Sequence, residues 1–272
     1  MLLLKGSAAK ELIEKEVQEY LEQFRARNEK VTIALFRVGE KPDDVRYEST
    51  IIKACARLGI ETSRALFPED VEEETLYREL KLAAKNDSFD GILLFRPLPV
   101  NLRTERIRTA IPAEKDIDGT LLEESAFLPC TPEGVMYLLK AYQIDVKGRK
   151  CVVVGRSPVV GKPLANLLRE AGAEVEVCHT QTPDVPAVTR TAEILFAACG
   201  KPRMIDRNYL TEGQIIIDIG FHAVDGALCG DVNAEDAAEL ASAYTPVPGG
   251  TGAVTLSVLL LHAVKAHERN RT

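Results

Sequence analysis

The most constraining feature of this sequence is the alternation of short strand-like segments with helix-like segments along nearly its whole length. Residues 30–38 and 150–154 are rich in branched apolar side chains, which is typical of strands in a buried sheet. Residues 8–27 instead repeat apolar side chains every three to four positions, as an amphipathic helix does. Because a helix between two strands returns the chain to the same end of the sheet, such strands pair in parallel. The sequence therefore predicts an α/β fold with parallel sheets.

The same pattern gives the expected elements. The expected helices span residues 8–27, 45–58, 72–86, 104–110, 132–141, 162–170, 184–191 and 252–268. The expected strands span residues 30–38, 62–67, 91–95, 150–154, 174–178, 194–198 and 214–219. Gly59 is expected to end the second helix as its C-cap. Thr131 and Pro132 are expected at the N-cap and the first position of the fifth helix.

Two domains are expected, separated by a polar, turn-rich stretch and a helix in the middle of the chain. We assign residues 1–140 together with 252–272 to an N-terminal α/β domain, onto which the last helix folds back. Residues 141–251 are assigned to a second domain with a Rossmann-like parallel sheet.

Composition argues against several classes of protein. The chain has 272 residues with 34 basic and 41 acidic side chains, and its net charge of -7 counts against nucleic-acid binding. No apolar run approaches the roughly 18 residues of a membrane span, and Met1–Leu4 is too short for the core of a signal peptide. The six cysteines are far apart and are expected to be reduced, without metal-ligand spacing. We expect a soluble cytoplasmic protein with no metal, membrane or nucleic-acid partner.

The strongest local signal for a ligand follows the strand at 150–154. There the chain runs through Gly155-Arg156-Ser157 to Val160-Gly161, and a helix then begins. A glycine turn before a helix presents free backbone N–H groups and the positive end of the helix to a phosphate. Taken alone the segment could be a tight connection, and Ser157 stands where the usual motif has its middle glycine. The strand–helix alternation that continues to Gly220 favours a dinucleotide site.

The choice of dinucleotide rests on two positions. The strand at 174–178 ends at His179-Thr180, without an acidic residue to accept the 2′-hydroxyl of an NAD ribose. Arg156 lies beside the glycine turn, where a guanidinium can pair with a 2′-phosphate. The sequence therefore favours NADP, with NAD possible and a surface charge as the alternative role for Arg156.

Three further segments have both a functional and a structural interpretation. Asp118, in the polar stretch between the halves, can accept two parallel hydrogen bonds from an amidine-like ligand edge, or be a solvated turn residue. Tyr47, on its helix, either stacks against a ligand or is a half-buried residue that packs against the protein. The glycine-rich segment 245–252 allows close backbone approach, or is a plain turn before the last helix.

Several short motifs, taken together and in their order along the chain, resemble the methylenetetrahydrofolate dehydrogenase/cyclohydrolase family, and the resemblance covers nearly the whole chain. The resemblance is carried by Tyr47, Pro97-Leu98-Pro99, Lys115-Asp116-Ile117-Asp118-Gly119, Pro129-Cys130-Thr131-Pro132, Gly155 to Pro163, and Pro248-Gly249-Gly250-Thr251-Gly252. It implies that tetrahydrofolate one-carbon derivatives bind in a cleft between the domains, that NADP binds the second domain, and that a homodimer forms through that domain.

The resemblance also implies roles for individual residues. Tyr47 would stack on the folate and Asp118 would anchor the pterin, as the catalytic pair of the substrate side. The implied substrate-binding residues are Tyr47, Pro97, Asp118, Pro248 and Gly249. The implied cofactor-binding residues are Gly155, Arg156, Ser157, Val160, Gly161, Thr180 and Gly220.

Two departures from the family pattern fall on catalytic positions. Where the family has a lysine four residues after the tyrosine, this chain has Ile51. Where it has a glutamine two residues before the Pro-Leu-Pro run, this chain has Phe95, followed by Arg96. Lys53 lies about 120° from Tyr47 around the helix axis, so it is a poor substitute for the lysine.

These substitutions lead us to expect NADP-dependent oxidation of 5,10-methylenetetrahydrofolate to the methenyl form, with weak or absent cyclohydrolase activity. The main alternative is the full bifunctional enzyme, with Arg96 or an ordered water replacing the lysine. The sequence also leaves open a nucleotide-binding regulatory protein without turnover, and an unrelated two-domain dehydrogenase such as one acting on shikimate or amino acids.

Overall fold

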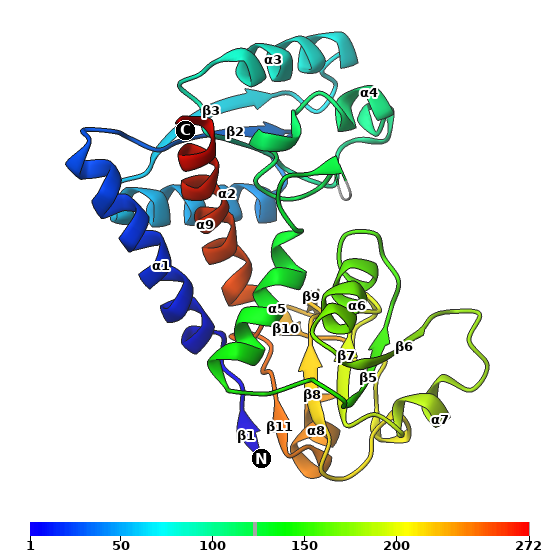
Figure 1. Cartoon of the computed structure of the whole chain (residues 1–272). Helices are drawn as coiled ribbons and strands as arrows, with labels where there is room; N and C mark the ends of the chain where they lie inside the picture. Colours follow the sequence, from blue (N-terminus) through cyan, green and yellow to red (C-terminus); the bar gives the residue numbers. More distant parts are fainter. Residues whose placement is uncertain (122–123, 272) are drawn as a thin grey trace. The chain divides into compact units, whose positions relative to one another are not determined.

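The computed structural model describes residues 1–121 and 124–271 (Figure 1). Its α-helices are α1 (Gly6–Ala26), α2 (Pro42–Leu58), α3 (Glu73–Lys85), α4 (Glu105–Arg108), α5 (Cys130–Ala141), α6 (Gly161–Glu170), α7 (Val185–Thr189), α8 (Ala234–Leu240) and α9 (Gly252–Arg271). Its strands are β1 (Leu2–Leu3), β2 (Thr32–Val38), β3 (Glu61–Phe67), β4 (Gly91–Leu94), β5 (Lys150–Val154), β6 (Glu174–Cys178), β7 (Ile194–Ala197), β8 (Ile215–Asp218), β9 (His222–Val224), β10 (Ala227–Cys229) and β11 (Ala243–Tyr244).

The chain forms two compact units. One comprises residues 14–128 and 259–272, and we call it the N-terminal unit. The other comprises residues 1–13 and 129–258, and we call it the C-terminal unit. Both contain parallel strands connected by helices, which confirms the predicted α/β class.

The N-terminal unit is built on the parallel sheet β3-β2-β4. Its central strand β2 is buried along six of its seven residues, because it has a partner strand on each edge and is covered on both faces. The core that packs on this sheet draws on β2, β4, α3 and the segment 98–111.

Helix α2 is anchored to this sheet by a buried ion pair. The Glu48 carboxylate accepts hydrogen bonds from Arg37 on β2 and from Arg64 on β3, both at 3.0 Å from the Nε atoms. Burial opposes the ionisation of Glu48, but the two guanidinium groups outweigh it and hold the pKa of the carboxyl below its usual value. The pair therefore fixes the rotation of α2, which carries Tyr47 and Ile51.

The C-terminal unit contains a six-stranded parallel sheet in the order β1-β11-β8-β7-β5-β6. After β1, the chain returns to this sheet at β5, adds β6 on one side and then β7 and β8 on the other. The strand order thus reverses between β5 and β7, where ligands of such sheets bind at the carboxyl ends of the strands. A small antiparallel hairpin, β9–β10, follows β8.

The structure differs from the sequence-based expectations in several elements. The two-residue strands β1 and β11 and the hairpin β9–β10 were not expected, because such short strands carry no periodic pattern. The prediction that Thr131 caps α5 is wrong: the helix begins at Cys130 with Pro129 as its N-cap. The Thr131 hydroxyl lies 3.3 Å from that of Thr255 instead. Gly59 ends α2 with φ +80°, as predicted.

The boundaries of the two compact units differ from those of the expected domains. Strand β1 lies in the C-terminal unit because it pairs with β11, and helix α5 lies in the same unit. Helix α9 contributes its first residues to that unit and residues 259–271 to the N-terminal unit. There, His262 contacts the carbonyl oxygen of Ile117 at 2.8 Å and His267 contacts the Asp90 carboxylate at 2.9 Å.

We predict that Glu48→Gln lowers the free energy of unfolding by about 3 kcal/mol at pH 7, because it leaves a buried guanidinium without its counter-charge. Since the native pKa of Glu48 is lowered, the effect is full above pH 4.5 and shrinks as the pH falls below it. Denaturant unfolding at pH 7 and pH 3.5 measures this. The control, Glu61→Gln, breaks an exposed pair with Lys30 and should cost less than about 1 kcal/mol. Equal losses in the two variants would contradict the anchoring role.

Candidate active site

A cavity of about 320 Å³ lies in the C-terminal unit at the carboxyl ends of β5, β6 and β7. The residues lining it are Val154, Gly155, Arg156, Ser157, His179, Thr180, Thr182, Val185, Ala198, Cys199, Lys201, Met204 and Tyr209. They follow the three strands that flank the reversal of strand order, where a dinucleotide binds in sheets of this kind.

Two glycines of the predicted phosphate turn are required by close packing of the backbone. Gly155 has φ +122°, and a Cβ atom there would lie 2.0 Å from the carbonyl oxygen of Ala198. A Cβ atom on Gly161 would lie 2.2 Å from the carbonyl oxygen of Gly155. The turn between β5 and α6 therefore brings bare backbone to the edge of the cavity, which is the arrangement that cradles a phosphate.

Ser157 has a structural task in this turn. Its hydroxyl oxygen accepts hydrogen bonds from the backbone N–H groups of Val160 and Gly161, at 3.2 and 3.3 Å. The serine thus stabilises the first turn of α6 from the place where the usual motif has a glycine.

The charge of the cavity favours a phosphorylated ligand. Arg156 and Lys201 are cations, and the described residues that line the cavity include no carboxylate. The Arg156 guanidinium donates a hydrogen bond to Oε1 of Gln181, at 3.2 Å, and so extends toward the end of β6. That strand end is where a 2′-hydroxyl or 2′-phosphate of a bound dinucleotide lies. The glycine turn between β5 and α6, the two cations and the lack of a carboxylate among the described lining residues together fit NADP.

Two fully buried carboxylates hold the loops after β7 and β8. Asp218 accepts hydrogen bonds from the backbone N–H groups of Gly220, Asp231 and Val232, at 2.9 to 3.0 Å. Asp231 accepts bonds from the N–H groups of Gly200 and Lys201, both at 3.0 Å. Burial raises the pKa of the Asp218 carboxyl to about 6.

In the N-terminal unit, the predicted catalytic positions lie on α2 and at the end of β4. Tyr47 is 38% exposed, and its ring centroid lies 5.9 Å from that of Phe95 in an edge-on arrangement. Ile51, one helical turn after Tyr47, is completely buried, and Phe95 is 6% exposed. The structure therefore has buried apolar side chains beside Tyr47 at both of these positions.

Arg96 follows Phe95 and lines a second cavity of about 360 Å³ in the N-terminal unit, together with Pro97, Arg103 and Arg108. Desolvation by partial burial lowers the pKa of the Arg96 guanidinium, although the charges of Asp116 and Asp118 oppose this shift. The side chain nevertheless keeps much of its surface open to solvent, so it remains a cation at neutral pH. Asp118, which is partly buried, lies close enough to Arg96 to interact with it electrostatically.

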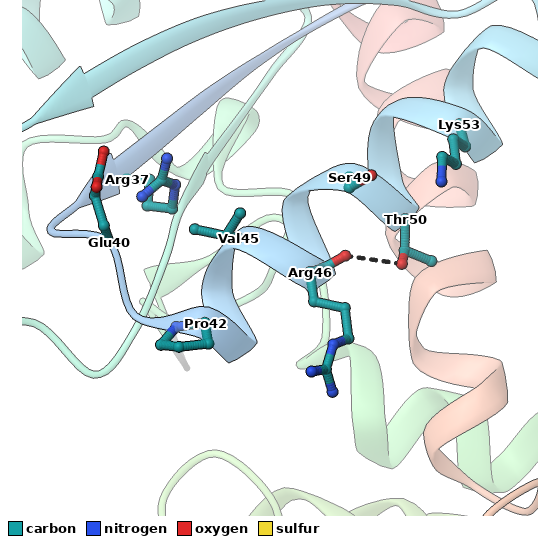
Figure 2. A pocket seen from close by; sticks show the side chains of 8 residues that line it. All are labelled: Arg37, Glu40, Pro42, Val45, Arg46, Ser49, Thr50 and Lys53. Atoms are coloured by element: carbon teal, nitrogen blue, oxygen red, sulfur yellow. Dashed lines mark hydrogen bonds between the residues drawn. The ribbon is translucent and has the colours of Figure 1, made fainter.

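Lys53 lies on a different face of α2. It lines a surface cavity of about 550 Å³ with Arg37, Glu40, Pro42, Val45, Arg46, Ser49 and Thr50, which Figure 2 shows from close by. Neither Tyr47 nor Ile51 lines this cavity. That Lys53 does not replace the lysine of the family pattern stays a prediction.

The glycine-rich segment before α9 lies in the C-terminal unit. Pro248 and Gly249 are exposed, and Gly249 has φ +102°. The carbonyl oxygen of Gly249 accepts a hydrogen bond from Gly6, at 2.8 Å. Thr251 donates a hydrogen bond to the carbonyl oxygen of Asp218, at 3.0 Å, and so ties the segment to the end of β8.

The predicted residues fall into two groups. Tyr47, Ile51, Phe95, Pro97 and Asp118 lie in the N-terminal unit, and the predicted cofactor residues lie in the C-terminal unit with Pro248 and Gly249. Of the cofactor residues, Gly155, Arg156, Ser157 and Thr180 line the cavity, Val160 and Gly161 belong to the turn before α6, and Gly220 lies in the loop after β8.

Sequence reasoning missed the cavity residues that follow β7, from Ala198 to Met204. The rule that parallel sheets bind ligands at the carboxyl ends of their strands could have found them.

Comparisons with known proteins agree with this architecture. The catalytic domain of tetrahydrofolate dehydrogenase/cyclohydrolase matches residues 4–118, and the NAD(P)-binding domain of the same family matches residues 129–271. The bifunctional protein FolD of Clostridium botulinum is 38% identical over 281 residues, which cover 98% of this chain and 99% of the relative.

Solved structures give the same result. The bifunctional FolD methylenetetrahydrofolate dehydrogenase/cyclohydrolase of Campylobacter jejuni has a TM-score of 0.93 and 35% identity, covering 99% of each chain. The Trypanosoma brucei FolD, solved with NADP and an inhibitor, has a TM-score of 0.90 and 29% identity, covering 99% of this chain and 98% of its own. No helix within residues 1–121 and 124–271 is both long and apolar enough to cross a membrane.

We predict that Gly155→Ala abolishes measurable NADP binding and lowers the melting temperature, because the added Cβ would overlap the Ala198 carbonyl oxygen. The control is Gly213→Ala in the same unit, where φ is +85° but no atom lies within 4 Å of the added Cβ. That variant should lose only about 1 kcal/mol of stability and bind NADP normally. Calorimetric titration with NADP and thermal unfolding measure both effects, and normal binding by Gly155→Ala would refute the close approach.

Proposed function

The chain belongs to the tetrahydrofolate dehydrogenase/cyclohydrolase family, and we propose that it is an NADP-dependent 5,10-methylenetetrahydrofolate dehydrogenase whose cyclohydrolase activity is weak or absent. The observation that carries the second half of this proposal is the apolar packing beside Tyr47. Ile51 is fully buried and Phe95 packs edge-on against the tyrosine ring, at the two positions where the family resemblance implies a lysine and a glutamine.

The two reactions of the family place different demands on the protein. The site would hold oxidised NADP as the acceptor of a hydride from the methylene carbon, and loss of that hydride would leave a methenyl bridge whose positive charge is shared by the two folate nitrogens. For this step the chain must mainly align substrate and cofactor. Hydrolysis of the methenyl bridge then requires that water be deprotonated as it attacks and that one nitrogen be protonated as it leaves. Acid–base catalysis of this kind typically contributes ~10²- to 10⁴-fold.

The side chains near Tyr47 are poorly suited to the second reaction. Ile51 and Phe95 have no proton to exchange. Arg96 has a lowered pKa, but a guanidinium hardly ever gives up its proton and so does not serve as a base. We therefore infer that the methenyl product leaves this protein without being hydrolysed on it.

On the substrate side, we propose that Tyr47 stacks on the folate and that Asp118 accepts two hydrogen bonds from the pterin edge, with Pro97, Pro248 and Gly249 as further contacts. Asp118 is partly buried, which strengthens a charge-assisted pair relative to one in water. We also propose that the protein is cytoplasmic and that two copies associate through the NAD(P)-binding domain.

A second candidate function is the complete bifunctional reaction. It is favoured by the names of the relatives, since the Clostridium botulinum and Campylobacter jejuni proteins are both described as bifunctional. In that case Arg96 would hold or polarise the attacking water, because it is the polar side chain next to Phe95 in sequence.

We predict that Arg156→Ala raises the KM for NADP at least tenfold and changes the KM for NAD by less than twofold, because only NADP has a 2′-phosphate for the guanidinium to pair with. Initial dehydrogenase rates with each dinucleotide test this. Arg149→Ala is the control, because Arg149 pairs with Glu193. Equal losses with NADP and NAD would assign Arg156 another role.

We predict that methenyltetrahydrofolate accumulates during oxidation and decays no faster than in buffer. Absorbance of the methenyl product during turnover, and after its addition to the protein without NADP, measures this directly. Clearance by the wild-type protein well above the buffer rate would support the bifunctional alternative.

Restoring the polar pair extends this test. Ile51→Lys with Phe95→Gln should introduce hydrolysis, because a lysine one turn after Tyr47 lies on the same side of α2 and gains a hydrogen-bond partner. Ile51→Lys alone should do less, since its ammonium group would meet Phe95. Lys53→Met is the matched control on the other face of α2 and should leave both rates unchanged. Failure of the double variant to hydrolyse, with its dehydrogenase activity intact, would count against the assigned pair.

A further inference from the structure

The two buried carboxylates of the C-terminal unit form one connected structure. The backbone N–H of Asp231 donates to the Asp218 carboxylate at 2.9 Å, and the Asp231 carboxylate in turn accepts from Gly200 and Lys201. A third donor reaches Asp231 from the hairpin β9–β10, where Nε2 of His222 lies 2.7 Å from Oδ1. Asp231 therefore links the loop after β7, the end of β8 and the hairpin.

The surroundings are shaped to fit these carboxylates. A Cβ atom on Gly230 would lie 1.9 Å from an oxygen of Asp218, and one on Gly220 would lie 2.5 Å from Oδ1 of Asp231. Both carboxylates are completely shielded from solvent. A buried charge is costly unless its hydrogen bonds are satisfied, and here each carboxylate has at least three donors.

The two carboxylates hold a backbone segment that lines the dinucleotide cavity. Ala198, Cys199 and Lys201 line that cavity, and the N–H groups bonded to Asp231 are those of Gly200 and Lys201. Asp231 does not line the cavity itself. Its carboxylate holds the backbone of residues 198–201 from the side away from the cavity. The Ala198 carbonyl, on the same segment, packs against Gly155.

We propose that Asp231 is a positioning residue for dinucleotide binding: with His222 as its side-chain donor, it holds the segment Ala198–Lys201 in the shape that completes the cofactor cavity. This rests on the proposed function only in taking the cavity as the NADP site. Because the carboxylate acts through the backbone, its loss should weaken binding of the cofactor and leave the folate side unaffected.

The first test is Asp231→Asn in the full-length protein. An asparagine keeps the shape but directs an NH₂ group at one of the donors that the carboxylate now accepts. The Kd for NADP, measured by calorimetry, should rise at least tenfold. The KM for methylenetetrahydrofolate and kcat at saturating NADP should change by less than twofold. Hydrogen exchange of the peptide that contains Gly200 and Lys201 should become faster, while exchange at β5 and β6 stays slow.

The matched control is Asp145→Asn. Asp145 also accepts a backbone hydrogen bond, from Lys147 at 2.9 Å, but it is exposed and precedes β5. The Kd of the Asp145→Asn variant for NADP should match that of the wild-type protein. If Asp231→Asn binds NADP as the wild type does, or if exchange quickens equally throughout the unit, the positioning role is wrong.

A second pair of variants leaves both buried carboxylates in place. His222→Gln retains an N–H donor and should keep the Kd within about twofold, whereas His222→Ala removes it and should raise the Kd several-fold with faster exchange at Gly200 and Lys201. Equal Kd values for the two variants would overturn the proposal even if Asp231→Asn does not fold. If the wild-type protein itself fails to bind NADP, the proposed function fails instead, and the two failures are thus distinguishable.

Discussion

Much of the C-terminal unit depends on one close approach of backbone to backbone. Gly155 packs against the carbonyl of Ala198, and Gly161 packs against the carbonyl of Gly155, with no space for a side chain at either glycine. This contact joins the ends of β5 and β7 across the point where strand order reverses, and it starts α6 at the same place. The position of the cavity and the path of the segment held by Asp231 both follow from it.

The N-terminal unit is organised by a different principle. In the N-terminal unit a buried charge, Glu48, fixes α2 through two arginines from neighbouring strands. The next helical turn carries Ile51, which completes an apolar contact rather than presenting a charge. One helix thus combines a strongly polar anchor with an apolar surface beside Tyr47, and this combination underlies the proposed separation of oxidation from hydrolysis.

The sequence predicted the features that local patterns determine. Alternating periodicity was sufficient for the α/β class, and the Gly155–Gly161 turn indicated the dinucleotide site because its chemistry lies in consecutive residues. The Asp231 network was not predictable in this way, since its partners lie 9 to 31 positions away and meet only after the sheet has formed. The N-cap of α5 was assigned wrongly because Thr131 has the right chemistry, but its hydroxyl faces Thr255.

The path of the chain through the two units has a consequence for how this protein can be divided. The chain passes from one unit to the other after residues 13, 128 and 258, so neither unit is a continuous segment. A fragment of residues 129–258 would lack β1, and β11 would become the edge strand, paired with β8 but with unpaired N–H and carbonyl groups on the side that β1 covered. It would also lose the bond between Gly6 and the glycine-rich segment. The isolated nucleotide-binding segment would therefore be prone to self-association, and a truncation study would require residues 1–13 to be fused back onto it.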